Sequence, residues 1–368
     1  MDQNRGLFIT LASVLLAVGI LMVHSASITS WPTEFEQVYL SRHLTFLLLG
    51  ITAATVCACL PARFWFQVGP YLFVLTVVLL ILVLVPGVGT RVNGAQRWLR
   101  YGPLSLQPSE LTKIALPLFL CRLMGRHREH LHHWFSGTLP IVFPAVVVLP
   151  LVLVQPDLGT SLFLAGVYAI TLFVGGWPIR NFIVAAAAAI PVILAAVTLK
   201  PYQMSRLSGF LASWSDWTAA PYQLKQSLIS FGAGGLWGVG LGKGWQKLSF
   251  LPEANTDFVF AVVGEELGLV GTLGLVVLWA GLFFTGLRLL RQLDRLSFAY
   301  LAGFTLLTQL VLQAVLNMAV VTALVPPKGI PHPLISYGGS NLCVSLVSLG
   351  IVISLSRADT AGDGIIAK

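Results

Sequence analysis

The sequence predicts an all-α polytopic membrane protein. Hydrophobic residues make up 56% of the chain and charged residues only 10%, whereas a soluble domain carries about 25% charged residues. Mean hydropathy is +0.85. Most segments between polar breaks approach the roughly 20 residues that a bilayer-spanning helix needs. These runs are continuously apolar and do not alternate, which excludes a β-barrel.

We expect about ten transmembrane helices in one domain covering residues 1–357, followed by a short cytoplasmic tail, 358–368. A long extracytoplasmic loop, about 200–256, precedes span eight. The first apolar run lacks a small-residue cleavage site, so we expect it to be retained as a span. The expected spans are 7–25, 42–60, 68–86, 109–123, 138–155, 157–176, 181–199, 257–286, 298–324 and 334–356.

The distribution of charge predicts the orientation. An even number of spans places both termini on one side, and the Lys and Arg bias of the short loops places that side in the cytoplasm. The loop at 200–256 then faces outward. The net charge of +8 fits this bias and anionic membrane lipid. No basic run with interleaved aromatic residues is present, so we expect no nucleic-acid partner.

One inside loop, 126–133, is rich in histidine and arginine. Its spacing matches no standard zinc pattern. We favour a basic loop that faces lipid headgroups and keep metal binding as the alternative. The four cysteines lie in or beside apolar runs, which is typical of small core residues and not of a disulfide framework.

The second outward loop, 87–109, combines cations with aromatic side chains. Arg91, Arg97 and Arg100 accompany Trp98 and Tyr101. Guanidinium groups bind phosphate and aromatic rings pack on sugars, so this loop suits a phosphorylated glycan. A lipid-headgroup anchor is the alternative.

The fourth span begins with a charged pair. Pro108 is placed to open a helix, and Glu110 and Lys113 then share one helix face because they are three residues apart. Two ionisable groups at a membrane entrance either neutralise each other or mark a cavity. Asp157, between spans five and six, either supports such a cavity or caps the next helix.

The stretch 222–268 is the main functional candidate. It is polar, glycine-rich and charged, and it re-enters an apolar run through Asp257. A carboxylate at the mouth of a membrane segment indicates a functional site; the alternative is a solvated acid that caps the next helix. The glycines of 232–244 fit neither a P-loop nor a dinucleotide fingerprint. We expect them to allow close backbone approach to a ligand or to another helix.

A polar stripe is expected on span nine. Gln309, Gln313 and Asn317 recur at intervals of four residues. Such stripes more often join helices than bind substrate.

Six motifs in order resemble one family over residues from about 6 to 357. They are Asn93-Gly94-Ala95 with Arg97-Trp98, Gln107-Pro-Ser-Glu110 with Lys113, Gln155-Pro-Asp-Leu-Gly-Thr160, Leu251-Pro-Glu-Ala-Asn-Thr-Asp-Phe258, Glu265-Glu-Leu-Gly268 and Pro333-Leu-Ile-Ser-Tyr-Gly-Gly-Ser340. Together they resemble the SEDS proteins (shape, elongation, division and sporulation). Three further stretches are similar to the cell-division branch: Tyr222-Gln-Leu with Gln226-Ser-Leu, Gly240-Leu-Gly242 with Gln246-Lys247, and Pro327-Lys328-Gly329. Asn255, where the family usually has histidine, and His332 depart from the pattern.

The resemblance implies a peptidoglycan glycosyltransferase that polymerises lipid II at the outer face of the cytoplasmic membrane. A class B penicillin-binding protein and other division proteins are the implied partners, and the division septum the implied location. A lipid II flippase, an elongation or sporulation polymerase and a non-catalytic scaffold are the alternatives. No dedicated metal site is evident, although a divalent cation could assist the pyrophosphate.

The resemblance also suggests roles for individual residues. Asp257 is the candidate base for the incoming sugar hydroxyl. Lys113 would stabilise the leaving pyrophosphate. Glu110 would either orient Lys113 or share the acid–base work. A single inverting displacement needs no carboxylate nucleophile. The residues expected to bind substrate are Arg91, Arg97, Trp98, Arg206, Lys247, Ser336 and Gly338.

Overall fold

The structure is a computed structural model of the chain. It describes residues 2–27, 34–92, 94–101, 104–198, 200–216, 218, 220–248 and 250–358. Most of the expected tail, 358–368, therefore lies outside the described residues, as do Asn93 and Trp217.

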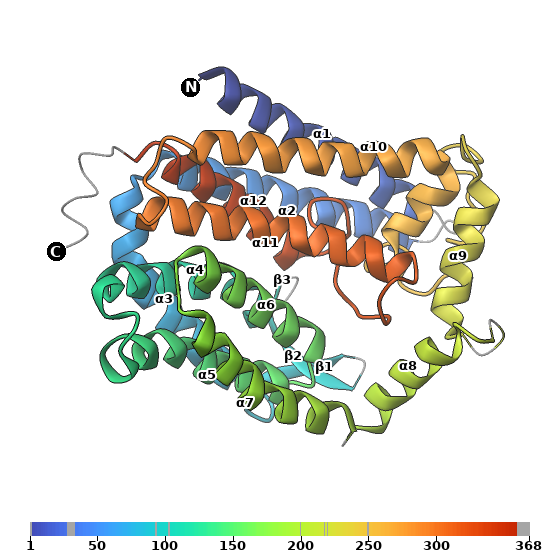
Figure 1. The fold of residues 1–368 in the computed structure, drawn as a ribbon. Helices are drawn as coiled ribbons and strands as arrows, with labels where there is room; N and C mark the ends of the chain where they lie inside the picture. The colour runs from blue at the N-terminus through green and yellow to red at the C-terminus, as the bar shows by residue number, and fades with distance from the viewer. Residues whose placement is uncertain are drawn as a thin grey trace. The chain divides into compact units, whose positions relative to one another are not determined.

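A helix forms at each of the ten expected spans (Figure 1). They are α1 (Asp2–Ser27), α2 (Glu34–Cys59), α3 (Ala62–Leu82), α4 (Pro108–Arg126), α5 (Leu139–Val154), α6 (Leu158–Val174), α7 (Ile179–Thr198), α10 (Val259–Leu290), α11 (Phe298–Val321) and α12 (Gly339–Leu355). The predicted helical membrane fold is confirmed. Among the described residues, seven helical segments are long and apolar enough to cross a membrane, while α6 and α12 are shorter apolar helices. The number ten therefore stays a prediction for the spans themselves.

The chain divides into two compact units. Unit 1 comprises residues 1–49, 194–285 and 310–342, and unit 2 comprises 50–193, 286–309 and 343–368. Long helices such as α2, α10 and α11 contribute to both units. Within unit 2, α3 packs against α4 and α5 packs against α6.

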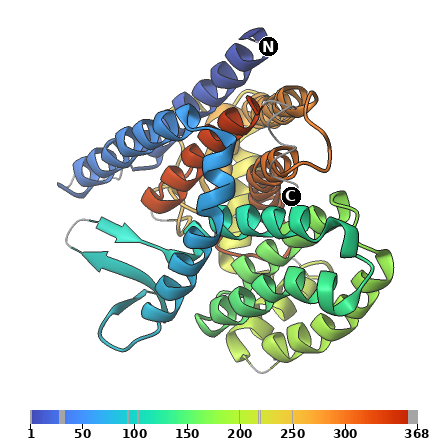
Figure 2. The ribbon, with the colours of Figure 1, turned by 90° about the vertical axis from the view of Figure 1, so that its left-hand side faces the viewer.

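A small antiparallel sheet lies within the segment 87–109, for which we predicted a loop and no strands. Strands β1 (Gly89–Val92), β2 (Ala95–Tyr101) and β3 (Leu104–Leu106) pair in the order β1-β2-β3. Figure 2 shows strands of this sheet beside the end of α3. Val92 pairs with Ala95, and Gly94 has a φ of +79°. An Asn-Gly pair between β-prone segments is a strong hairpin signal, and this signal was missed.

Two helices lie in the long loop before α10. They are α8 (Pro201–Ala212) and α9 (Tyr222–Gly234). α9 includes the stretch 226–231, which combines apolar and polar residues in an amphipathic pattern. The glycine-rich segment follows directly.

The element α10 is two helices joined by a reversal, which corrects the single span expected at 257–286. Gly268 interrupts the helix with φ 66° and ψ −161°, a conformation open only to glycine. The rings of Phe260 and Trp279 have centroids 6.3 and 5.7 Å from that of His332. In a straight helix these two residues would lie about 28 Å apart, since each residue rises 1.5 Å. The half-helix 259–267 therefore folds back against the helix 269–290, which is long enough to span alone.

Candidate active site

Asp257 lies directly before the short half-helix of α10, in unit 1. Its main-chain oxygen accepts a hydrogen bond of 2.7 Å from Nδ2 of Asn317 on α11. The same amide nitrogen donates to the main-chain oxygen of Ile330 at 2.8 Å. One buried asparagine thus fixes the backbone of Asp257 and of the segment after α11. Gln313 of the same stripe donates to the main-chain oxygen of Pro331 at 2.8 Å. Two residues of the polar stripe therefore bind loop backbone, which differs from the helix-to-helix role that we expected.

A second set of hydrogen bonds joins the same two segments. The hydroxyl of Ser336 donates to the main-chain oxygen of Thr256 and accepts from the main-chain nitrogen of His332 at 2.7 Å. The main-chain nitrogen of Tyr337 donates to the oxygen of Asn255 at 2.8 Å. Ser336, which we predicted to bind substrate, is thus buried in a structural network beside Asp257. Gly338 lies two residues further on, and its role in substrate binding stays a prediction.

Gly329 leaves room for the carboxylate of Asp257. A Cβ atom at position 329 would lie 2.8 Å from Oδ2 of Asp257, closer than a carbon and an oxygen pack without strain. Nη1 of Arg206, on α8, donates to the main-chain oxygen of Pro327 at 3.3 Å. The guanidinium of Arg206 is therefore bound to Pro327, two residues before Gly329, and Gly329 borders the carboxylate of Asp257. The role of Arg206 in substrate binding stays a prediction.

Both segments that hold Asp257 contain strained backbone. Glu253 has a φ of +58° and Leu334 a φ of +63°. The left-handed region is unfavourable for residues with a Cβ atom, and such strain persists only where the surroundings over-determine it. The geometry around Asp257 is therefore specified by the whole unit and not by local preference.

The two glutamates before the reversal hold the glycine-rich segment. Glu265 accepts hydrogen bonds from the main-chain nitrogens of Trp245 (2.7 Å) and Gln246 (3.2 Å). Glu266 accepts from the main-chain nitrogen of Gly242 at 3.1 Å. A Cβ atom at Gly238 would lie 2.1 Å from the main-chain oxygen of Glu266. The glycines thus allow close approach to another helix, which confirms the second of our two alternatives.

Lys247 lies in this interior network. Its Nζ is 2.6 Å from Oε1 of Glu266 and donates to the hydroxyl of Ser25 at 2.8 Å. The side chains of Lys247 and Glu266 are 1% and 0% exposed. Lys247 therefore has a structural ion pair, and its predicted contact with substrate stays untested.

Glu110 and Lys113 form the expected pair in unit 2. Pro108 opens α4 and Glu110 stands in its first turn, as the sequence predicts. Nζ of Lys113 donates to Oε1 of Glu110 at 2.7 Å, and both side chains are 5% exposed. The ammonium also lies 5.7 Å from the centroid of the Phe163 ring. The two buried charges of this pair neutralise each other, and removing one partner would leave the other uncompensated.

Arg97 fastens the sheet of unit 2 to the break between α5 and α6. Its guanidinium donates to the main-chain oxygens of Gln155 (2.9 Å) and Pro156, and lies 3.4 Å from Oδ2 of Asp157. Oδ1 of Asp157 accepts from the main-chain nitrogen of Thr160 at 3.1 Å, which makes Asp157 the N-cap of α6. The capping alternative is confirmed for Asp157. Arg97 has a structural role that its sequence position did not reveal.

The other two predicted substrate residues of unit 2 lie in the same sheet. Arg91 is exposed on β1, and Trp98 on β2 is half-buried and pairs with Thr90. Among the described residues, no group of three or more histidines, cysteines and acids is placed to hold a metal ion.

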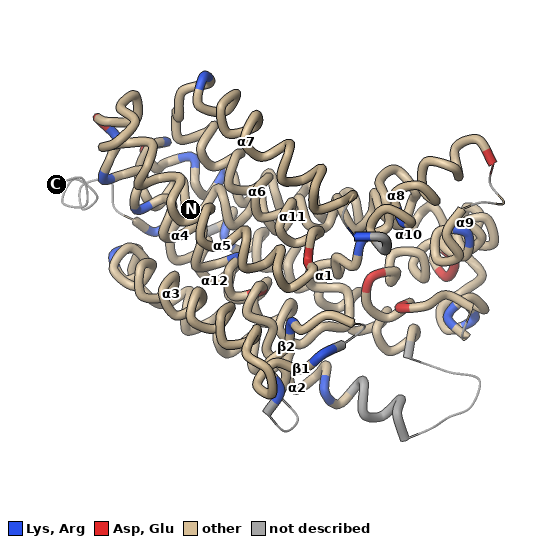
Figure 3. The backbone as a smooth tube through the Cα atoms, turned by 90° about the horizontal axis from the view of Figure 1, so that it is seen from below, with Lys and Arg blue, Asp and Glu red and all other residues tan. Residues whose placement is uncertain are grey.

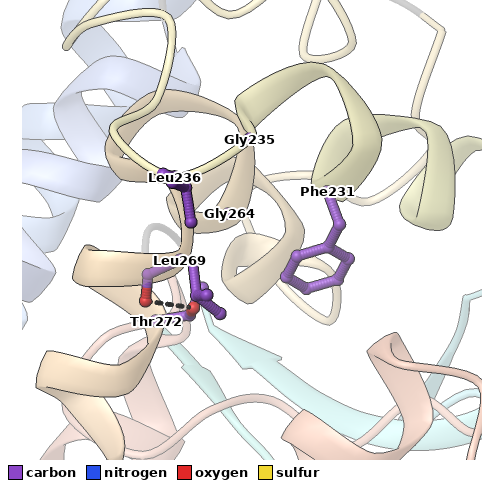
Figure 4. Close-up of a pocket in the computed structure, with 6 residues that line it drawn as sticks. All are labelled: Phe231, Gly235, Leu236, Gly264, Leu269 and Thr272. Atoms are coloured by element: carbon purple, nitrogen blue, oxygen red, sulfur yellow. Dashed lines mark hydrogen bonds between the residues drawn. The ribbon is translucent and has the colours of Figure 1, made fainter.

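A cavity of about 310 Å³ lies beside the reversal of α10 (Figure 4). Its lining is apolar apart from Thr272, whose hydroxyl donates to the main-chain oxygen of Leu269 at 3.0 Å. No ionisable side chain lines this cavity, so it offers no acid–base chemistry. The lining residues are Phe231, Gly235, Leu236, Gly264, Leu269 and Thr272.

The family model described as "Cell cycle protein", for FtsW, RodA and SpoVE, matches residues 5–361. The chain belongs to the SEDS family. It is similar to the probable peptidoglycan glycosyltransferase FtsW of Coxiella burnetii, with 39% identity over 93% of each chain. It is 34% identical to that of Saccharophagus degradans over 97% of this chain and 94% of the relative. The predicted family is confirmed.

Two solved structures share the fold of this SEDS protein. One is a chain of a peptidoglycan synthase complex studied for coordination of polymerization and crosslinking, with a TM-score of 0.76 and 30% identity over 95% of this chain and 96% of that one. The other is the rod shape determining protein RodA of Thermus thermophilus, with a TM-score of 0.69 and 31% identity over 95% of each chain. These likenesses support a multi-span SEDS membrane protein.

Proposed function

We propose that this protein is an FtsW-type peptidoglycan glycosyltransferase, which polymerises lipid II at the outer face of the cytoplasmic membrane during cell division. The observation that carries the proposal is 39% identity to a probable peptidoglycan glycosyltransferase over 93% of both chains. The rigidly held Asp257 supplies the catalytic group that such a reaction needs. A class B penicillin-binding protein is the proposed partner, because a structural neighbour comes from a peptidoglycan synthase complex.

In the proposed reaction, a sugar 4-hydroxyl attacks the anomeric carbon of a polyprenyl-pyrophosphate-linked sugar. Asp257 accepts the proton of the hydroxyl as the new C–O bond forms, and the bond to the pyrophosphate oxygen breaks with its electron pair. The configuration at the anomeric carbon inverts. Asp257 suits this role because three hydrogen bonds from its surroundings fix residues 255–257, and a positioned base contributes about 10²–10⁴-fold.

Cations are proposed to stabilise the leaving pyrophosphate. Arg206 is anchored beside the Gly329 segment that borders Asp257. Lys113 carries the second proposed cation, and Glu110 orients it through their ion pair. Charge placed where the leaving group develops its own charge lowers the barrier without reorganisation.

The test is polymerisation of purified lipid II by the full-length protein together with its transpeptidase. Asp257→Asn removes the base while keeping the side-chain shape, and we expect the rate to fall by about 10²–10⁴-fold. Asp216→Asn is the matched control, because Asp216 is a fully exposed carboxylate in the same loop. We expect glycan ladders from wild type and from this control.

Equal ladders from wild type and Asp257→Asn would remove Asp257 as the base and leave the polymerase standing. No ladders from an intact wild-type complex would overturn the proposal. A lipid II flipping assay in vesicles would then test the transporter alternative.

A further inference from the structure

One end of unit 2 carries a concentrated positive surface, which we call the basic end. It consists of three segments: the turn after α4, the first turn of α7, and the end of α10 with the connection to α11. Figure 3 marks the Lys and Arg positions of the chain in blue. The basic end has six exposed arginines and only two exposed carboxylates, Glu129 and Asp294. The arginines are Arg126, Arg128, Arg180, Arg288, Arg291 and Arg295.

Two contacts join these three segments, one between two side chains and one from a side chain to the backbone. Nη1 of Arg128 lies 3.9 Å from Oδ2 of Asp294, which joins the first segment to the third. Nη2 of Arg180 donates to the main-chain oxygen of His132 at 2.8 Å, which joins the second to the first. The Arg128 and Asp294 side chains are 54% and 65% exposed, so their pair contributes little stability. The arginines therefore form one surface, and the nearby carboxylates neutralise only a small part of its positive charge.

The basic end lies at the level where membrane helices begin and end. Apolar spans run over Trp134–Val154, Ile179–Thr198 and Val259–Leu290. Arg180, Arg288 and Arg291 lie within one turn of a terminus of these spans. This depth corresponds to the lipid headgroups and not to a domain that projects into water.

Exposed aromatic residues accompany the arginines. Trp134 is 48% exposed and Phe135 is 87% exposed, at the π-helical turn before α5. Aromatic side chains at a span terminus insert at the boundary between headgroups and acyl chains. An acidic protein partner would need no such apolar residues beside the cations at this depth.

We propose that the basic end binds the phosphate headgroups of anionic membrane lipids, with Trp134 and Phe135 inserted among the acyl chains. Clusters of Lys and Arg directly beside a span attract anionic headgroups, and each cation contributes to the attraction. This surface is separate from the proposed polymerase chemistry, and its test does not depend on that activity.

The experiment measures lipid selectivity of the full-length protein in phosphatidylcholine vesicles. Trace spin-labelled phosphatidylglycerol or spin-labelled phosphatidylcholine is added, and the motionally restricted fraction of each gives their relative association with the protein. We expect wild type to favour phosphatidylglycerol about three- to tenfold at 0.1 M salt. At about 0.5 M salt we expect this preference to weaken, because the surface is exposed.

The combined variant Arg126→Gln, Arg128→Gln, Arg291→Gln and Arg295→Gln is expected to reduce the preference to less than about twofold. The matched control Arg42→Gln, Lys200→Gln, Lys225→Gln and Lys243→Gln removes the same charge from unit 1 and is expected to keep it. Replacing the same four arginines (126, 128, 291 and 295) by lysine is also expected to keep the preference. The thermal unfolding midpoint identifies any variant that fails to fold.

Three outcomes would overturn the proposal: no preference for phosphatidylglycerol in wild type, an unchanged preference in the glutamine variant, or an equal loss in the unit 1 control. Binding of an acidic polyglutamate peptide to wild type without any lipid preference would assign the basic end to a protein partner instead.

Discussion

At the scale of single residues, the ion pair between Lys247 and Glu266 allows a test of whether Lys247 stabilises the fold or contacts the substrate. Lys247→Met would leave the carboxylate of Glu266 buried without its cation, and breaking such a pair costs about 3–5 kcal/mol. We expect a clear fall in the thermal unfolding midpoint in detergent micelles. Lys243→Met is the matched control, because Lys243 is an exposed lysine of the same segment, and its midpoint should stay near that of wild type.

The double variant Lys247→Met with Glu266→Gln completes this comparison. Replacing both partners of a buried pair by neutral groups of similar volume restores much of the stability. We expect lipid II polymerisation to recover with the stability, because the Lys247 side chain is 1% exposed and its ammonium is held by Glu266 and Ser25. A stable but inactive double variant would instead support the predicted contact of Lys247 with substrate.

At the scale of elements, the reversal at Gly268 positions the half-helix that follows Asp257. A Cβ atom there would lie 2.4 Å from the main-chain nitrogen of Gly238 and 2.6 Å from the oxygen of Leu236, at a φ of +66°. Gly268→Ala should therefore destabilise the protein by about 2 kcal/mol or more and reduce polymerisation. The measurements are the unfolding midpoint and the lipid II assay.

Gly274→Ala provides the control for this prediction. Gly274 lies in the same helix, and a Cβ atom there meets nothing within 4 Å. Alanine is favoured over glycine within a helix by up to about 1 kcal/mol, so the control should be as stable as wild type or more so. Equal behaviour of the two variants would show that the reversal tolerates an ordinary residue.

The same element shows what a sequence pattern can and cannot predict. The apolar runs place a helix at all ten expected segments, because burial in lipid is a property of each run alone. The reversal at Gly268 has no such local signal: Glu265 and Glu266 read as surface charges, yet both are buried against the glycine-rich segment. The partners of those glutamates lie about twenty residues away, and only the fold identifies them.

At the scale of the whole molecule, the sequence identifies the candidate catalytic residues but not the residues that hold them in place. Asp257, Glu110 and Lys113 stand out in the sequence because ionisable groups at membrane entrances are costly. The residues that hold them do not stand out. Asn317 reads as helix glue and Arg97 as a phosphate ligand, whereas their partners are loop carbonyls and a helix cap. Hydrogen bonds between distant segments leave no periodic trace in the chain.

The stability of the whole protein should depend on pH through His332. This residue is 0% exposed, its ring packs on Phe260 and Trp279, and its Nε2 has no partner among the described residues. Burial lowers the pKa of His332 from 6.5 to about 4. Between these values the unfolded chain binds a proton that the folded protein does not, so the free energy of unfolding falls as pH falls. At pH 5 the loss should be about 2 kcal/mol relative to pH 7.

The measurement is the thermal unfolding midpoint in detergent micelles between pH 5 and pH 7.5. His332→Gln removes the titrating group, whereas every other ionisable group remains in both proteins. The variant should therefore lose less stability than wild type over this interval, even if its stability at pH 7.5 is lower. Parallel pH curves would show that the imidazole gains a proton in the folded protein as readily as in the unfolded chain. In that case water would have to reach His332 between Phe260 and Trp279, the two rings that pack on it.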